Sequence, residues 1–200
     1  MTIAVTPFVY INKYNKICYS INKEWSDLAY KINKEIFMLC DLKNFKKIFD
    51  KKKIRAVIIS GGGDIYKIKK TNINKLRDKF ELELADYCFK KEIPIIAVCR
   101  GFQLLASEEG CKLIKTNQNF NKHSLIIKIK DKEQKIIVNS YHNYKIFNIS
   151  SKFKILGKCK DESVEIASHK EKKLMCFMMH PERPGNNKII LRIFKNFINK

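Results

Sequence analysis

Short apolar runs alternate with amphipathic stretches through the first half of the chain. Four of these runs, each typical of a strand buried on both faces, are Ile3–Val5, Phe37–Cys40, Arg55–Ile59 and the segment from Pro94 to Cys99. Between and after them, apolar residues recur at helical spacing. The predicted helices run from an N-cap at Ser26 or Asp27 to about Ile36, from about Ile73 to Lys90, and from Cys99 to about Glu109, where Gly110 is a natural stop.

The second half of the chain changes to strands that follow one another with little helix between them. The predicted strands are Leu125–Ile129, Lys135–Asn139, Phe153–Leu156, Val164–Ala167 and Leu174–Met179, and an amphipathic helix follows from Asn186. Alternating strands and helices indicate a parallel sheet, and consecutive strands indicate an antiparallel extension of it. We therefore predict one α/β domain over residues 1–200, built on an open, mostly parallel sheet.

Cys99 occupies the predicted turn between a buried strand and a helix. Such a turn exposes its central residue above the sheet, and it needs small neighbours such as Ala97 and Gly101 because the two backbones approach closely. A thiol at a helix N-terminus also meets the positive end of the helix dipole, which favours the thiolate. One of seven cysteines could equally be a buried structural residue, but this local pattern favours a nucleophile.

A possible general base and its carboxylate partner lie directly after the last predicted strand. His180 and Glu182 flank Pro181, so the carboxylate could hold one ring nitrogen while the other takes the proton of Cys99. His123 and His142 each border a strand, and we rank them as substrate-side candidates. His169 lies in a polar stretch and is expected to be exposed.

Three consecutive glycines follow the predicted strand Arg55–Ile59. At the carboxyl edge of a parallel sheet, Gly61, Gly62 and Gly63 can direct backbone N–H groups into a site, as an oxyanion hole requires. No Gly-Lys-Ser/Thr sequence follows, which argues against a phosphate-binding loop of the Walker type. The N–H of Arg100, directly after the nucleophile, would be the second donor.

The net charge of +21 raises the possibility of a nucleic-acid-binding protein. However, the lysines are spread along the chain, and only five of the 41 basic residues are arginine. A composition rich in Lys, Ile and Asn can also reflect an AT-rich genome. We expect no nucleic-acid partner, although a basic surface would attract an anionic small substrate such as a nucleotide.

Compartment and metal content are inferred from the cysteines and the apolar runs. The cysteines are scattered and form no CxxC pair, which argues against both a disulfide framework and a zinc site. No apolar run approaches the roughly 20 residues of a membrane span. The N-terminus lacks the pattern of a secretion signal. We expect a cytoplasmic protein with no membrane partner, no metal and no cofactor.

Taken together, these motifs resemble the class I glutamine amidotransferases, and most closely their γ-glutamyl hydrolase-like branch. The resemblance covers nearly the whole chain and rests on Ala97–Gln103, Asn139–His142 and His180–Glu182, with support from Ser60–Gly63, Arg77–Glu81 and Val164–Ile166. It implies a flavodoxin-like open sheet. Two positions depart from the family: Ala97 stands where glycine is common, and Asn143-Tyr144 stands where related chains often carry glutamine.

The resemblance also implies roles for individual residues. Cys99 would be the nucleophile, His180 the general base and acid, and Glu182 the carboxylate that orients it. The backbone amides of Gly62 and Arg100 would form the oxyanion hole, and Gly61 and Gly63, on either side of Gly62, would contact the substrate. The glutamyl group would be bound by Gln103, Ser140, Tyr141 and His142.

These roles predict a hydrolase that cleaves a γ-glutamyl amide through a γ-glutamyl thioester. The predicted substrate is a small γ-glutamyl amide with an anionic nucleotide on the far side of the amide. The first alternative is a glutaminase subunit that passes ammonia to a separate synthase partner. The second is a basic nucleic-acid-binding or regulatory protein on an inactive amidase scaffold, against which the intact Cys, His and Glu argue.

Overall fold

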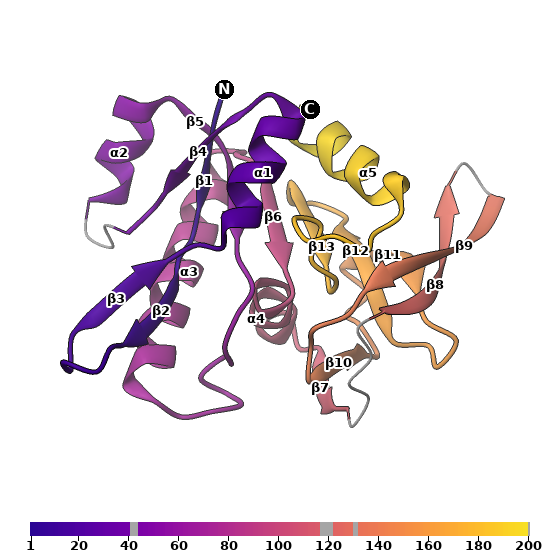
Figure 1. The fold of residues 1–200 in the computed structure, drawn as a ribbon. Coiled ribbons are helices and arrows are strands. Elements are labelled where there is room, and N and C mark those ends of the chain that lie inside the picture. The colour runs from indigo at the N-terminus through magenta and orange to yellow at the C-terminus, as the bar shows by residue number, and fades with distance from the viewer. Residues whose placement is uncertain (41–43, 117–121, 130–131, 200) are drawn as a thin grey trace.

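The computed structural model describes residues 1–40, 44–116, 122–129 and 132–199, and a nine-stranded sheet runs through it (Figure 1). Five neighbouring strands pair in parallel, and four further strands extend the sheet in antiparallel fashion. In spatial order the strands are β4 (Glu35–Met38), β1 (Thr2–Val5), β5 (Ile54–Ile59), β6 (Ile95–Val98), β13 (Leu174–Phe177), β12 (Val164–His169), β11 (Phe153–Lys158), β8 (Lys122–Ile129) and β9 (Lys132–Asn139). The predicted fold class, an open α/β sheet with an antiparallel extension, is confirmed.

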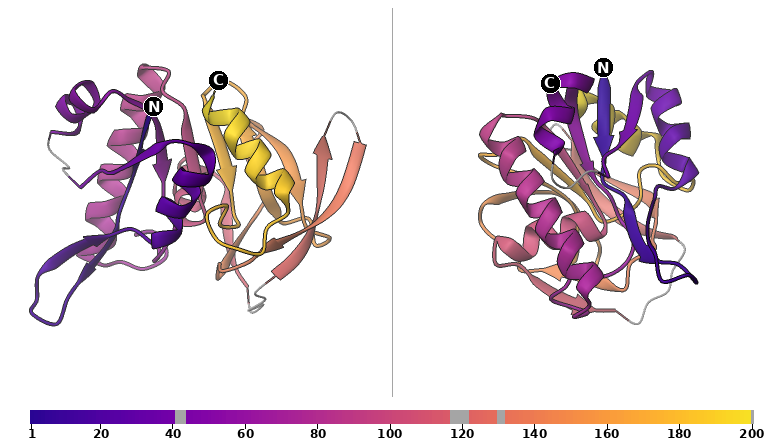
Figure 2. Two further views of the ribbon diagram at one scale, coloured as in Figure 1. Left: turned by 45° about the horizontal axis from the view of Figure 1, so that its top comes forward. Right: turned by 90° about the vertical axis from the view of Figure 1, so that its left-hand side faces the viewer.

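Helices cover both faces of the sheet, and each face has its own hydrophobic core (Figure 2). Side chains alternate between the faces along each strand, so Ile58 and Val98 belong to one core, and Val57 and Ala97 to the other. The first core includes residues of α1 (Lys23–Ile32) and α5 (Lys188–Ile198), and the second includes residues of α2 (Phe45–Lys52), α3 (Asn72–Lys90) and α4 (Arg100–Glu108). Two cores explain why the central strands are almost entirely apolar, with Arg55 near the start of β5 as an exposed exception.

The first helix differs from its prediction at both ends. Its N-cap is Asn22 rather than Ser26 or Asp27, and it ends at Ile32 because Asn33 adopts a left-handed conformation with φ of 54°. The next strand starts at Glu35, so the predicted helical position Ile36 belongs to a strand. The apolar spacing of Ile32 and Ile36 fits a helix, but a helix-ending residue lies between them.

Two small two-stranded sheets stand outside the main sheet, and the hydrophobic pattern did not predict them. One pairs β2 (Phe8–Ile11) with β3 (Ile17–Ser20), and the other pairs β7 (Lys112–Lys115) with β10 (Tyr144–Phe147). Their strands have only four residues each, and most of their side chains are exposed or only partly buried, so they carry little apolar signal. Among the residues described, no helix is both long and apolar enough to cross a bilayer.

Candidate active site

Cys99 forms a strained turn at the carboxyl end of β6. Its backbone has φ of 50° and ψ of −104°, a conformation that residues other than glycine rarely adopt. Helix α4 begins at the next residue. The close approach predicted from small neighbours is present at Gly101, where a Cβ atom would lie 2.3 Å from the carbonyl oxygen of Ile59. The turn therefore aims one side chain at the carboxyl edge of the sheet, as a nucleophile elbow does.

His180 and Glu182 meet Cys99 at this edge. The Nδ1 atom of His180 lies 2.6 Å from Oε1 of Glu182, and both side chains are buried. Burial alone would lower the pKa of His180, but the Cys99 sulfur and Glu182 outweigh it and raise the pKa to about 9. The arrangement favours a protonated imidazole between a sulfur and a carboxylate.

Asn139, at the end of β9, holds the backbone of His180 in place. Its side-chain oxygen accepts the His180 N–H at 2.9 Å, and its amide nitrogen donates to the His180 carbonyl at 2.9 Å. Asn186 donates to the same carbonyl at 2.7 Å. These bonds satisfy the buried backbone N–H and C=O groups of His180, just after β13, and so hold the residue that carries the imidazole ring in place.

The glycine loop follows β5 and borders the same edge. Gly62 and Gly63 have φ of 90° and 76°, which glycine adopts without strain. A Cβ atom on Gly61 would lie 2.6 Å from Cε1 of His180 and 3.2 Å from Cβ of Cys99, so the loop packs directly against both side chains. The ring of Phe8, on β2, packs against Gly62 and Gly63, where added Cβ atoms would lie 3.3 Å and 3.2 Å from it.

Arg77, on α3, orients the peptide groups of this loop. Its guanidinium donates to the carbonyls of Gly62 at 2.6 Å and of Gly61 and Ser60 at 3.1 Å. In a trans peptide the carbonyl and the following N–H point in opposite directions. The N–H groups of Gly62 and Gly63 therefore point away from Arg77, and both residues line the cavity next to Cys99.

The side chain of Arg100 points into the protein, away from this cavity. It pairs with Asp78 and Glu81 of α3, and Glu81 also accepts from Arg77 at 2.9 Å. Burial raises the pKa of Glu81, but the two guanidinium groups outweigh burial and lower it. The backbone N–H of Arg100 is at the first position of α4, where a helix supplies no acceptor for it.

A cavity of about 240 Å³ opens over Cys99 and His180. Most of the residues expected to bind substrate line it, namely Gly62, Gly63, Gln103, Tyr141 and His142, together with Asp64, Asn143, Tyr144 and Arg183. Gly61 lines a neighbouring cavity together with His180, and Ser140 lines a third. Of the expected substrate-binding residues, these two are therefore outside the cavity over Cys99.

Arg183 is the only arginine or lysine among the described residues that line the cavity over Cys99. Its guanidinium stacks 4.6 Å from the ring centre of Tyr141. The rings of Tyr141 and His180 are nearly perpendicular, with their centres 5.7 Å apart. Tyr141 is half exposed, so it forms part of the rim of the cavity.

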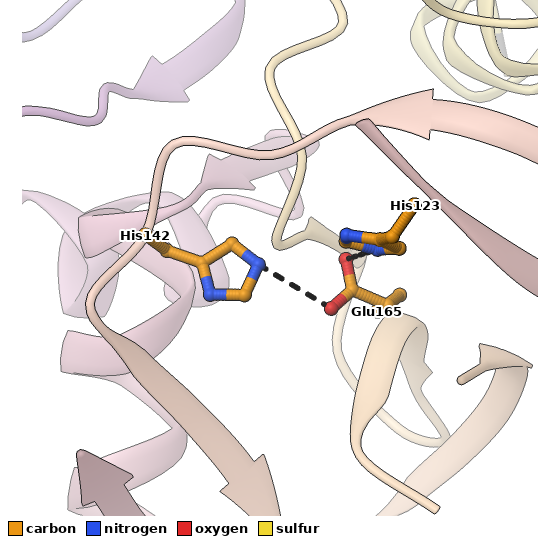
Figure 3. Close-up of side chains that lie close together, drawn as sticks. All are labelled: His123, His142 and Glu165. Atoms are coloured by element: carbon orange, nitrogen blue, oxygen red, sulfur yellow. Dashed lines mark ion pairs between the residues drawn. The ribbon is translucent and has the colours of Figure 1, made fainter. Parts of the chain in front are cut away.

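The remaining histidines divide into two groups. His123 and His142 lie on either side of Glu165 (Figure 3), at 3.3 Å and 3.5 Å from its carboxylate oxygens. His169, expected to be exposed, is buried at the end of β12, where Nδ1 accepts the N–H groups of Glu171 and Lys172. That expectation is wrong because a polar turn folds back over the ring.

Comparisons with known proteins agree with this geometry. A model of the family "Glutamine amidotransferase class-I" matches residues 9–199, and the chain belongs to this family. It is 29% identical over 180 residues to the γ-glutamyl-CDP-amidate hydrolase of Campylobacter jejuni, covering 84% of each chain. It is 27% identical to a glutamine-hydrolyzing GMP synthase subunit of Thermoplasma volcanium, covering 72% of this chain and 69% of the relative.

A solved structure shares the fold. The crystal structure of a putative GMP synthase subunit from Thermoplasma acidophilum superimposes with a TM-score of 0.71 at 18% identity. The alignment covers 100% of this chain and 92% of the other.

Three residues that contribute to the site were given no role on the basis of the sequence. Arg77, Asn139 and Glu165 stood in the segments that carried the family resemblance, but nothing in the sequence indicated their contacts. Each acts on a partner far away in the chain, so only the fold brings the pairs together. Glu165, a charged residue between the apolar Val164 and Ile166, is the one case with a signal in the sequence. Arg77 and Asn139 lie on elements rich in polar residues, so their burial becomes apparent only in the fold.

Proposed function

We propose that the protein hydrolyses a γ-glutamyl amide with Cys99 as nucleophile, His180 as general base and acid, and Glu182 as the orienting carboxylate. The observation that carries the proposal is the 2.6 Å contact between His180 Nδ1 and Glu182, with the other side of the ring turned to the sulfur of Cys99. This is the arrangement of an activated thiol nucleophile.

The reaction would proceed in two steps. The Cys99 sulfur bonds to the γ-carbonyl carbon, and the backbone amides of Gly62 and Arg100 hold the oxyanion, each contributing about 3 kcal/mol. The C–N bond then breaks as His180 gives its proton to the leaving nitrogen. In the second step His180 takes a proton from water, which attacks the thioester and releases glutamate.

For the substrate, we propose a γ-glutamyl nucleotide amidate, namely γ-glutamyl-CDP-amidate, which would yield cytidine diphosphoramidate for the synthesis of a capsular phosphoramidate. Two observations support this choice. The relative from Campylobacter jejuni carries that activity in its name, and it is similar over 84% of both chains. Arg183 places a positive charge beside the nucleophile, where a diphosphate on the leaving nitrogen would lie.

The test is turnover of the purified protein with γ-glutamyl-CDP-amidate and with glutamine, followed as glutamate release. We expect the nucleotide amidate to be the better substrate, and acid quenching to trap a glutamyl adduct on Cys99 detectable by mass spectrometry. Cys99→Ala is the control for both measurements. A strong preference for free glutamine would refute the nucleotide substrate.

Similarity to a glutamine-hydrolyzing GMP synthase subunit supports one alternative, a glutaminase that delivers ammonia to a separate synthase. This alternative predicts weak turnover of glutamine by the isolated chain and strong stimulation by a partner. Copurification with a synthase, together with that stimulation, would favour it.

A further inference from the structure

A second cluster of chemically active side chains lies beside the catalytic cavity. His123 on β8, Glu165 on β12 and His142 after β9 come from three separate segments, and their ligand atoms all lie within 4.8 Å of one another (Figure 3). Glu165 is 1% exposed, and it is surrounded by the antiparallel half of the sheet. The proposed hydrolysis gives none of these side chains a chemical step.

The contacts within the cluster are ion pairs that lack the geometry of good hydrogen bonds. Nε2 of His123, Nε2 of His142 and both oxygens of Glu165 are buried, and none of them has a hydrogen-bond partner among the described residues. Burying polar atoms without hydrogen bonds is unfavourable, and one cation could bind all three residues, because their ligand atoms lie within 4.8 Å of one another.

The second nitrogen of His142 shows which charge fits. Its Nδ1 lies 3.1 Å from the carbonyl oxygen of Tyr144, which can only accept, so Nδ1 carries the hydrogen. In the neutral ring, Nε2 then presents a lone pair to the Glu165 carboxylate at 3.5 Å. Two electron-pair donors that face each other at this distance can share a cation. An outer carbonyl that holds Nδ1–H is also the usual support for a metal-binding histidine.

From this geometry we propose that His123, His142 and Glu165 bind a divalent transition-metal ion, with Zn²⁺ as the preferred ion. Ligands of a tetrahedral Zn²⁺ with bonds near 2.1 Å stand about 3.4 Å apart. Here Nε2 of His123 lies 3.3 Å from Oε2 of Glu165 and Nε2 of His142 lies 3.5 Å from Oε1, so each imidazole faces its own carboxylate oxygen. One ligand atom of each residue lies within 4.8 Å of the others. Two imidazoles and one carboxylate form a ligand set that zinc uses, whereas Mg²⁺ and Ca²⁺ prefer oxygen ligands.

The cluster also has an open side. His123 and His142 line a cavity of about 210 Å³, which leaves room for a water or an anion as the fourth ligand. His142 lines the cavity over Cys99 as well. A bound ion would therefore connect the antiparallel extension to the wall of the catalytic cavity. In the sequence, the spacing of the cysteines argued against a zinc site. That spacing gave no information on His123, His142 and Glu165, because none of these three ligands is a cysteine.

Zn²⁺ binding to the chelator-treated protein tests the proposal, by calorimetry and by metal analysis after dialysis. We expect about one Zn²⁺ per chain, as for a single closed set of ligands. Glu165→Gln should weaken binding by more than the roughly 10- to 100-fold that loss of an outer partner costs. His169→Gln is the matched control, because His169 is also a buried histidine beside a carboxylate, with Nε2 3.7 Å from Oε1 of Glu109. This variant should bind Zn²⁺ as the native chain does.

A further measurement covers the case in which a variant fails to fold. Zn²⁺ should raise the unfolding midpoint of the native chain and of His169→Gln, because a ligand that binds only the folded state stabilises it. Mg²⁺ at the same concentration should not. Equal Zn²⁺ binding by the native chain and a folded Glu165→Gln variant, or no Zn²⁺ binding by the native chain, would overturn the proposal. Neither readout depends on hydrolase activity.

Discussion

Replacing Arg77 with Met should impair catalysis through the glycine loop, although Arg77 does not line the cavity over Cys99. The change keeps an unbranched, flexible side chain, shorter than that of arginine, and removes the charged hydrogen bonds to the carbonyls of residues 60–62 and to Glu81. Without these bonds, the N–H groups of Gly62 and Gly63 are no longer held in one direction. We class Arg77 as a positioning residue for the proposed oxyanion hole.

The expected magnitudes follow from the contacts. Breaking a buried ion pair costs about 3 to 5 kcal/mol, and the lower end applies because Glu81 keeps Arg100 and Thr6 as partners. For a chain of this size, about 3 kcal/mol lowers the unfolding midpoint by roughly 6 to 12 °C. Because loss of one oxyanion donor costs about 100- to 1,000-fold in kcat, we expect kcat to fall by about 100-fold, with a smaller change in KM.

The assay compares thermal unfolding and initial rates of glutamate release, with rates measured well below the midpoint of each variant. Lys79→Met is the control on the same helix: its pair with Glu83 is exposed at 4.0 Å, so we expect a change within about 0.5 kcal/mol and the native kcat. If folded Arg77→Met has the kcat of Lys79→Met, the glycine loop does not need Arg77, and the reasoning fails.

Further predictions concern the triad and the turn. Glu182→Gln should lower kcat by roughly 10- to 100-fold, the cost of a charge-assisted hydrogen bond, and an unchanged kcat would contradict its orienting role. Because the pKa of His180 is raised from 6.5 to about 9, the stability that its proton contributes is complete below pH 6.5 and is lost as pH rises through 9. Denaturant titrations at a series of pH values should show this loss of stability, and the loss should be smaller in Cys99→Ala. The same pH dependence in the native protein and in Cys99→Ala would argue against the contact between Cys99 and His180. Gly101→Ala should destabilise the fold by about 1 to 3 kcal/mol, since its Cβ would lie 2.3 Å from the Ile59 carbonyl, and a native unfolding midpoint would contradict this.

The sequence was informative where a function depends on neighbouring residues. The turn at Cys99 and the pair His180 and Glu182 could be recognised because each needs its residue types at fixed spacing. The fold class could be recognised for the same reason, since strands buried on both faces must be apolar throughout. The two small two-stranded sheets were missed because little apolar periodicity marks their strands. The end of the first helix at Asn33 was missed because the apolar spacing continues past it to Ile36.

By itself, the sequence determined the class of fold and the candidate nucleophile and base. Only the tertiary structure decided which distant groups meet: Arg77 with the glycine loop, Asn139 with His180, and Glu165 with two histidines. The physical reason is that such contacts depend on how helices and strands pack, and packing joins residues whose separation in the chain carries no pattern. Local hydrogen bonds and periodicity are encoded in neighbouring residues, whereas the compensation of buried charge is a property of the folded chain.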